Sequence, residues 1–409
     1  MKILLLGIGV ANLGCARLLD KYYIEYDLKQ ISEIKSLEEY DLIVKSPGIS
    51  LYDEIFKDCN AKIISDLELV YLLEPRFIIC VTGSNGKTTV SSMLGHVLSK
   101  KYKAIVCGNI GYSFADAVLE NPDAKIFIVE ASSFQLEAID KFCPNISVLL
   151  NASLCHIDHH ISFSNYLNAK KNIYRNQSFN DYTIYNADDK LLNRFECYSN
   201  KISFSAKSTL GNIYVLDEYI YYRSKRIYHL SETELMQSHL ISNYCAVFAV
   251  IHALKYSFRK TRKLIKKFKF LDYRLQKIDE YIYNDAKSTN CASTIAALNS
   301  LDEVHLICGG YDRGIDINLP PEVLCKIKSA YVYGQSNDKL FNYFAKNNVI
   351  CYKFNTLKDA FSYCYSKRKG KENILYSPMH ASFDQYKNYQ ERGMEFNKLY
   401  KEKKDLSPS

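Results

Sequence analysis

Residues 81–90 read VTGSNGKTTV, and this stretch decides the fold. It follows an apolar run, FIICVT at 77–82, and precedes a helical pattern that begins near Thr88. Glycines in such a turn let backbone N–H groups point at phosphate oxygens, and the helix N-terminus adds a favourable dipole. The usual phosphate-loop pattern has one more glycine, where Val81 stands here. A strand, a glycine loop and a helix in this order predict a nucleotide-phosphate site.

The side chains of this loop have separate predicted roles. Lys87 neutralises charge on the β- and γ-phosphates, and the Thr88 hydroxyl holds Mg²⁺. A chance G-K-T-T in a loop is the alternative, and the strand–loop–helix context favours a functional site. The loop residues expected to bind ATP are Gly83, Ser84, Asn85, Gly86, Lys87, Thr88 and Thr89.

The composition indicates a globular protein of more than one domain. The chain has 409 residues, of which 47% are hydrophobic and 24% are charged. The net charge of +8 does not exclude nucleic acid, but the basic residues are scattered, so we expect no nucleic-acid partner. Thirteen cysteines without a C-x-x-C pair indicate a reducing compartment rather than disulfides or zinc.

The N-terminus, MKILLLGIGVANLGCARLL, has to be weighed as a signal peptide. Gly7, Gly9 and Gly14 interrupt its apolar run, and Arg17 follows at once, so a buried strand and a glycine turn fit better. No apolar run reaches the ~18 residues that a membrane span needs. We therefore expect a soluble, cytoplasmic protein without a membrane partner.

Strand-like and helix-like patterns alternate along the chain, which predicts an α/β protein with largely parallel sheets. Three series of such units suggest three domains, with boundaries at 1–74, 75–270 and 271–409. We expect a Rossmann-like first domain, a central domain like that of phosphate-loop NTPases, and a Rossmann-like third domain. The first domain has Gly7-x-Gly9 but Asn12 in place of the third glycine, so a preference for NAD is weakly supported.

The loop TGSNGKTT resembles the shortened phosphate loop of the Mur ligase family, T-G-[ST]-x-G-K-[ST]-[ST]. That resemblance implies an ATP-dependent amide ligase with three α/β domains, although the loop alone would equally fit a folylpolyglutamate synthase. EASSFQLE at 130–137 and SPMHASFDQYKNYQERG at 377–393 resemble the branch of the family that adds D-glutamate. The resemblance covers nearly the whole chain and is loosest in the first domain.

Glu130 ends a predicted strand at the carboxyl edge of the sheet, where a Mg²⁺ ligand is needed. The resemblance implies that His156 holds a second Mg²⁺, although Leu154 and Cys155 stand where the family has acidic residues. It also implies that Lys170 carries a carbamate and helps hold that ion. From the sequence alone, Lys170 would be a surface lysine.

The histidines of NASLCHIDHH, residues 151–160, have two other interpretations, a zinc cluster or a polar loop. Zinc would need further ligands, and no cysteine pair supplies them.

The resemblance assigns the remaining positions. Leu240 replaces one of the asparagines that the family has near adenine, while Asn243 keeps the other. The further residues expected to bind ATP are Asn243, Arg274 and Asp285. The residues expected to bind substrate are Gly9, Val10, Ala11, Ser46, Asn109, Ser132, Lys287, Thr289, Arg313, Ser382 and Tyr389.

The implied reaction is addition of D-glutamate to UDP-N-acetylmuramoyl-L-alanine, driven by ATP and two Mg²⁺ ions, in the making of peptidoglycan precursors. The implied catalytic residues are Lys87, His156 and Lys170. We expect a monomer whose domains close on the substrates. Two alternatives remain, a related ligase with another acceptor and a non-catalytic nucleotide-binding relative, the latter suggested by Leu154, Cys155 and Leu240.

Overall fold

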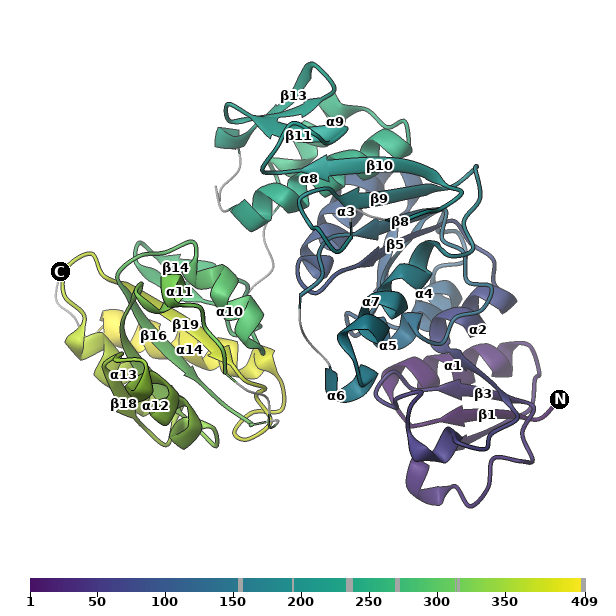
Figure 1. The fold of residues 1–409 in the computed structure, drawn as a ribbon, viewed down its shortest axis with the longest axis horizontal. Helices are drawn as coiled ribbons and strands as arrows, with labels where there is room; N and C mark the ends of the chain where they lie inside the picture. The colour runs from purple at the N-terminus through teal and green to yellow at the C-terminus, as the bar shows by residue number, and fades with distance from the viewer. Residues whose placement is uncertain are drawn as a thin grey trace. The chain divides into compact units, whose positions relative to one another are not determined.

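The computed structural model describes residues 1–153, 157–192, 195–232, 238–268, 273–312, 314 and 317–405, without the side chains of 157, 158, 238, 239 and 292. The chain forms two compact units, Met1–Phe268 and Lys269–Ser409. The first unit contains two sheets and the second contains one (Figure 1). Among the described residues, no helix combines the length and the apolarity that a membrane crossing requires.

The first sheet has four parallel strands in the order β2-β1-β3-β4. The apolar runs ILLL and LIVK form its two central strands, which are buried throughout. Asn12 stands where a third glycine was considered, and its side-chain amide donates to the carbonyls of Leu6, Gly7 and Val44. The elements are β1 (Ile3–Leu6), α1 (Val10–Lys21), β2 (Tyr26–Lys29), β3 (Leu42–Lys45), β4 (Lys62–Ser65) and α2 (Asp66–Leu73).

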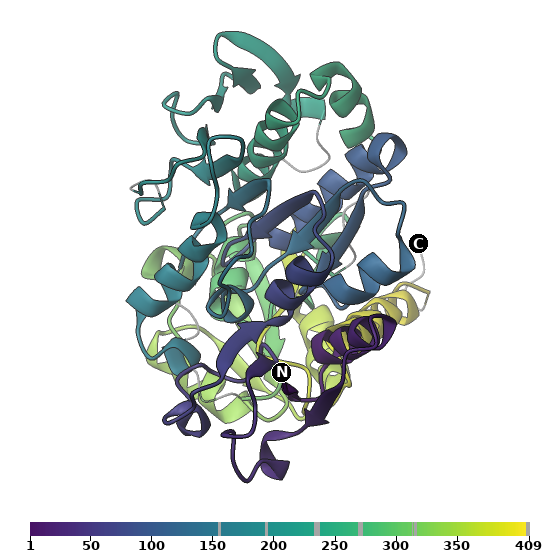
Figure 2. The ribbon, with the colours of Figure 1, turned by 90° about the vertical axis from the view of Figure 1, so that its right-hand side faces the viewer.

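The second sheet has nine strands in the order β13-β12-β11-β10-β9-β8-β5-β7-β6. The strands from β6 to β11 are parallel, and β11, β12 and β13 are antiparallel at the end that lies at the top of Figures 1 and 2. α3 and α8 pack on each other beside this sheet. The strands are β5 (Ile78–Thr82), β6 (Ile105–Gly108), β7 (Phe127–Glu130), β8 (Ile146–Leu149), β9 (Tyr182–Asn186), β10 (Asn200–Ser205), β11 (Ile213–Leu216), β12 (Tyr219–Tyr222) and β13 (Lys225–His229). The helices are α3 (Lys87–Tyr102), α4 (Phe114–Glu120), α5 (Ser133–Leu136), α6 (Ile157–His160), α7 (Phe163–Lys171), α8 (Ser238–Ala253) and α9 (Phe258–Ile265).

The sheet of the second unit has six strands in the order β14-β15-β19-β16-β17-β18. Its strands are parallel except for the β14–β15 pair. The elements are β14 (Gln276–Asp279), β15 (Ile282–Asn284), α10 (Cys291–Leu298), β16 (Val304–Gly309), α11 (Pro321–Leu324), β17 (Ile327–Tyr333), α12 (Asn337–Lys346), β18 (Cys351–Lys353), α13 (Leu357–Lys367), β19 (Asn373–Met379) and α14 (Tyr389–Asp405).

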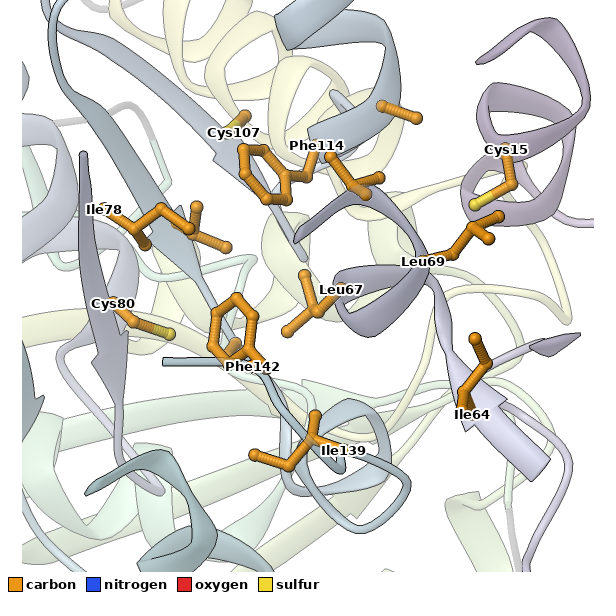
Figure 3. Packing of buried hydrophobic residues seen from close by; sticks show 14 of the residues in the cluster. Cys15, Ile64, Leu67, Leu69, Ile78, Cys80, Cys107, Phe114, Ile139 and Phe142 are labelled. Carbon is orange, nitrogen blue, oxygen red and sulfur yellow. The ribbon is translucent and has the colours of Figure 1, made fainter. Parts of the chain in front are cut away.

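One hydrophobic core joins the first two sheets. In Figure 3, Leu67 and Leu69 of α2 lie between Ile64 of β4 and the central side chains Ile78 and Phe142. This continuous burial explains why residues 1–268 form one compact unit, since removing apolar surface from water is the main favourable term in folding. The predicted boundary at residue 74 stays a prediction.

The α/β class and the three largely parallel sheets are confirmed. The tyrosine-rich hairpin from β11 to β13 was not anticipated, because its burial alternates weakly along strands of only four or five residues. The twelve described cysteines are all free thiols.

Candidate active site

The phosphate loop lies between β5 and α3, as the sequence predicts. Lys87 is the first residue of the helix, and its Nζ donates to the carbonyl of Gly83 at 2.7 Å. Thr88 and Thr89 are buried at the start of the same helix. The ammonium group therefore lies over the loop that backbone N–H groups and the helix dipole make attractive to phosphate.

Gly86 caps the helix with a φ of +84°, a left-handed conformation that glycine adopts without strain. A Cβ at this position would lie 2.6 Å from Oδ1 of Asn243 on α8. The predicted adenine residue Asn243 is thus brought against the phosphate loop. A side chain at position 86 would therefore have to displace Asn243.

Asn151, which follows β8, and Tyr166 on α7 both contact the phosphate loop. Oδ1 of Asn151 accepts from the backbone N–H of Asn85 at 2.8 Å, and its Nδ2 donates to the Asn85 carbonyl at 3.0 Å. Oγ of Ser84 lies 2.6 Å from the hydroxyl of Tyr166 on α7. The loop is therefore shaped by two neighbouring segments before any nucleotide binds.

Glu130 ends β7, next to β5, and the residue is 3% exposed. Its Oε2 has no hydrogen-bond partner among the described residues. A buried, unsatisfied carboxylate oxygen is costly unless a cation or donor completes it. The backbone N–H of Asn109 donates to the Glu130 carbonyl at 2.8 Å, which places this predicted substrate residue beside the strand end.

Lys170 is 2% exposed, so the interpretation as a surface lysine is wrong. It lies near the end of α7, with Nζ 4.7 Å from the centre of the Tyr166 ring. Tyr166 in turn contacts Ser84, so Lys170 is one side chain away from the phosphate loop. His156 lies outside the described residues.

The predicted substrate residues of the first sheet also come together. Gly9 precedes α1 without a side-chain cap, and a Cβ on it would lie 3.3 Å from Oγ of Ser46. Val10 is exposed and Ala11 half-buried at the start of the helix. The glycine turn and Ser46 therefore lie next to each other at the N-terminus of α1, and a helix N-terminus is suited to bind a diphosphate.

Ser132, on the central sheet, caps α5, where its Oγ accepts from the backbone N–H of Gln135 at 3.2 Å. Ser132 therefore acts as the N-cap of this helix, and it remains half-buried.

In the second unit, Asp285 is the centre of a buried hydrogen-bond network. One carboxylate oxygen accepts from the backbone N–H of Leu275, and the other accepts from the hydroxyls of Ser288 and Ser377. Burial raises the pKa of Asp285 to about 6 despite these donors and nearby Arg274. Asp285 thus has a structural role, since it joins the residue before β14, the segment after β15 and strand β19.

The predicted amino-acid residues of this unit lie on two adjacent segments. Nζ of Lys287 lies 5.1 Å from the centre of the Tyr389 ring at the start of α14. Ser382 is buried, whereas Arg274 and Thr289 are half-buried. Arg313 lies outside the described residues. A cavity of about 410 Å³, lined by Tyr311, Phe383 and three polar residues, opens next to Ser382 along the chain.

Comparison with known proteins supports one family. The model of the Mur ligase middle domain matches residues 81–251, which include the phosphate loop and the central sheet. A curated relative from Thermoanaerobacter sp. (strain X514), named UDP-N-acetylmuramoylalanine--D-glutamate ligase, is 32% identical and covers 98% of both chains. A relative of the same name from Staphylococcus aureus (strain MW2) is 30% identical over 97% of this chain and 95% of its own. The chain belongs to the Mur ligase family.

Solved Mur ligases share the fold at low identity. The UDP-N-acetylmuramate-alanine ligase MurC from Thermotoga maritima has a TM-score of 0.62 and 17% identity, and the match covers 98% of this chain and all of that one. The MurF ligase from the same organism, solved with ADP, has a TM-score of 0.59 and 15% identity over 90% of this chain and 97% of its own.

Sequence reasoning missed several residues that shape the site of this Mur ligase. Tyr166 and Arg392 look like ordinary core positions in the sequence, and Glu137 like a surface carboxylate, yet each is buried against predicted site segments. Asn151, Glu137 and Arg392 stand in runs that carry the resemblance, although no role was assigned to them, whereas Tyr166 carried no such signal. All four gain their contacts from packing between segments that are distant in sequence.

Proposed function

We propose that this Mur ligase joins D-glutamate to UDP-N-acetylmuramoyl-L-alanine through an acyl phosphate made with ATP. The chain is a ligase of the D-glutamate-adding type in peptidoglycan precursor synthesis, as its full-length relatives are. The observation that carries the chemistry is the phosphate loop with Lys87 folded over it, together with the buried Glu130 at the end of the neighbouring strand β7.

Activation by ATP overcomes a specific barrier. A carboxylate repels an attacking amine and has no adequate leaving group. Transfer of the γ-phosphoryl group to the L-alanyl carboxylate supplies one, and the amine of D-glutamate then displaces phosphate. The protein needs no nucleophile, so its contribution is positioning and charge neutralisation. Lys87 supplies positive charge at the transferred phosphoryl group.

We assign Mg²⁺ to the loop edge on the chemistry of the donors. Oxygen ligands suit Mg²⁺, and the buried, unpartnered Oε2 of Glu130 fits a cation there, together with the hydroxyl of Thr88. When bound, the ion neutralises charge on the nucleotide phosphates. A second ion, held by His156 and a carbamate on Lys170, is part of the same proposal.

The D-glutamate side is assigned to the second unit. Lys287, Thr289, Arg313, Ser382 and Tyr389 are the residues proposed to bind it. An arginine at 313 would bind a carboxylate in a bidentate manner. Arg274 and Asp285 are proposed to contact the nucleotide. A cytoplasmic location fits the free thiols and is part of the proposal.

Phosphate release tests this function. The enzyme is incubated with ATP and Mg²⁺, and UDP-N-acetylmuramoyl-L-alanine and D-glutamate are added separately and together. Turnover that needs both and that L-glutamate does not support is the expected result. Turnover with another acceptor would place the chain elsewhere in the family, and ATP binding without any turnover would identify a non-catalytic relative.

A further inference from the structure

A buried cluster of four ionisable side chains lies outside the residues assigned above. The carboxylate of Glu137 accepts from Nζ of Lys45 at 2.8 Å and lies 2.9 Å from Nε2 of His159. Its other oxygen lies 3.0 Å from Nδ1 of His160. The side chains of Lys45 and Glu137 are 0% and 6% exposed, so this ion pair is shielded from water.

The cluster connects three segments: the turn after β3, the α5 segment and the segment that contains His159. The first two carry the proposed substrate residues Ser46 and Ser132. Lys45 ends β3 directly before Ser46, and its Nζ also donates to the carbonyls of Ile49 and Phe134. Ser50 of the same turn donates from its hydroxyl to the carbonyl of His159 at 2.6 Å. Since Phe134 and Glu137 belong to the run that begins at Ser132, the first sheet is tied directly to the α5 segment.

From His160 the contacts continue to the phosphate loop. Nε2 of His160 lies 2.9 Å from Oγ of Ser133, and its ring meets Tyr166 edge-on with centroids 5.6 Å apart. The hydroxyl of Tyr166 contacts Oγ of Ser84, and Nζ of Lys170 lies over the face of the Tyr166 ring. An unbroken series of contacts therefore runs from Lys45 on the first sheet to the loop and to Lys170.

The buried charges indicate that the cluster fixes the relative positions of these segments rather than adding to the free energy of unfolding. Burying an ion pair costs desolvation that its attraction barely offsets, and apolar residues of similar size would be equally stable. Burial works against ionisation, but His159, His160 and Lys45 together lower the pKa of Glu137 to about 2, so the carboxylate is charged. Lys45 and His159 both lie within hydrogen-bond distance of the same carboxylate oxygen, and these two directed contacts give the charged group one well-defined position.

A metal ion is the rival explanation, because the ligand atoms of Glu137, His159 and His160 lie within 4.8 Å of one another. The ammonium of Lys45 speaks against it, since it already lies 2.8 Å from the carboxylate and would repel a divalent cation.

We propose that Lys45, Glu137, His159 and His160 are positioning residues. They hold the segment of Ser46 against the segments of Ser132 and Tyr166. In this way they fix the position of the proposed UDP-substrate residues relative to the phosphate loop. The proposal rests on the proposed function for its kinetic consequences. The geometry it requires lies entirely within residues 1–268, which form one compact unit.

The test compares three variants with the wild-type enzyme. Glu137→Gln leaves the Lys45 ammonium buried without its anion, and the melting temperature should fall. The double variant Lys45→Met with Glu137→Gln removes both charges, and its melting temperature should return toward the wild-type value. The matched control is Lys62→Met with Asp140→Asn, an exposed ion pair that also links the first sheet to the central one.

The kinetic readout separates positioning from stability. In the stable double variant, kcat should stay reduced about tenfold or more, because misplacement of reacting groups by a fraction of an ångström is costly, while the KM for ATP changes little. The control should keep wild-type kcat. Recovery of kcat together with the melting temperature would overturn the proposal and leave a structural ion pair.

A second readout does not depend on activity. Hydrogen exchange at residues 83–86 and 163–171 should be faster in the double variant than in the control pair, and equal exchange would overturn the proposal. A stoichiometric transition metal in the purified enzyme that Glu137→Gln removes would also overturn it, in favour of a metal site. Absence of wild-type turnover would count against the proposed function, while the exchange result would still decide the positioning role.

Discussion

The burial of Lys170 changes the interpretation of its role from a surface lysine to a candidate site residue. A lysine among polar neighbours on a helix suggests solvent, yet its side chain is 2% exposed and lies on the Tyr166 ring, next to the phosphate loop. A buried amine that can react with CO₂ becomes a carboxylate-like ligand, which suits Mg²⁺. Lys171, its neighbour, is only half-buried and lines a cavity of about 640 Å³.

Lys170→Ala should lower kcat by about a hundredfold or more, because a charged group at the phosphoryl-transfer site is lost. Acetate or another short carboxylic acid should restore part of that rate by occupying the place of the carbamate. Phosphate release measures both effects. Lys171→Ala is the control and should retain nearly full activity. A Lys170→Ala enzyme that acids cannot rescue, or that is fully active, would contradict the carbamate.

Asp285 makes a residue-scale contribution that depends on pH. Its pKa is raised from 3.8 to about 6 in the folded chain, chiefly by burial. Between those values the folded state holds a proton that the unfolded state has released. The contribution to stability is therefore complete below pH 3.8 and is lost as the pH rises through 6.

Asp285→Asn removes this titration. The free energy of unfolding of the variant minus that of wild type should increase between pH 4 and pH 7. The increase should reach up to about 3 kcal/mol for a pKa shift near two units. Urea unfolding at several pH values gives the difference. Asp359→Asn, at an exposed helix cap of the same unit, is the control. A wild-type-minus-variant difference that does not change with pH would contradict the assignment.

At the scale of elements, the turn from β5 into α3 is set by two constraints at once. Gly86 has a φ of +84°, and the space for a Cβ is filled by Asn243 of α8. A helix that is distant in sequence thus lies against this turn, and it brings Asn243, which is proposed to lie near adenine, next to the proposed phosphate site.

Gly86→Ala should weaken ATP binding at least about tenfold, because the left-handed backbone is strained and the new Cβ displaces Asn243. Titration with an ATP analogue gives the affinity. Gly111→Ala is the matched control, since Gly111 also has a positive φ, +96°, but nothing lies near its Cβ position. Equal affinities in the two variants would mean that the Asn243 contact does not shape the loop.

At the scale of the whole molecule, a single buried arginine connects distant segments of the second compact unit. Arg392 of α14 is 0% exposed and donates from Nη2 to the carbonyls of Ala286 and His380. These carbonyls belong to the two segments that carry Lys287 and Ser382. Nη1 and Nε have no partner among the described residues, so the guanidinium is held by position rather than by a carboxylate.

Arg392→Met should raise the KM for D-glutamate by about tenfold or more and leave ATP-analogue binding nearly unchanged, because the two segments lose their common anchor. Hydrogen exchange should quicken within residues 273–405 and stay unchanged in β5, β7 and β8, since local opening follows local contacts. Arg368→Met, a half-buried arginine of the same unit, is the control. Faster exchange throughout both units would contradict this local role.

The sequence by itself determined the α/β class, the largely parallel sheets, the phosphate loop and the strand-end position of Glu130. These features depend on residues that are adjacent in the chain, where apolar runs, glycines and helix signals act locally. Only the tertiary structure decided that Lys170 is buried, that Asn243 closes on Gly86 and that Lys45 meets Glu137. The Asn243–Gly86 contact joins residues 157 positions apart (243 − 86), and the Lys45–Glu137 contact joins residues 92 positions apart (137 − 45). The burial of Lys170 depends on what packs over its helix, and burial is a property of the whole packed unit that no local pattern encodes.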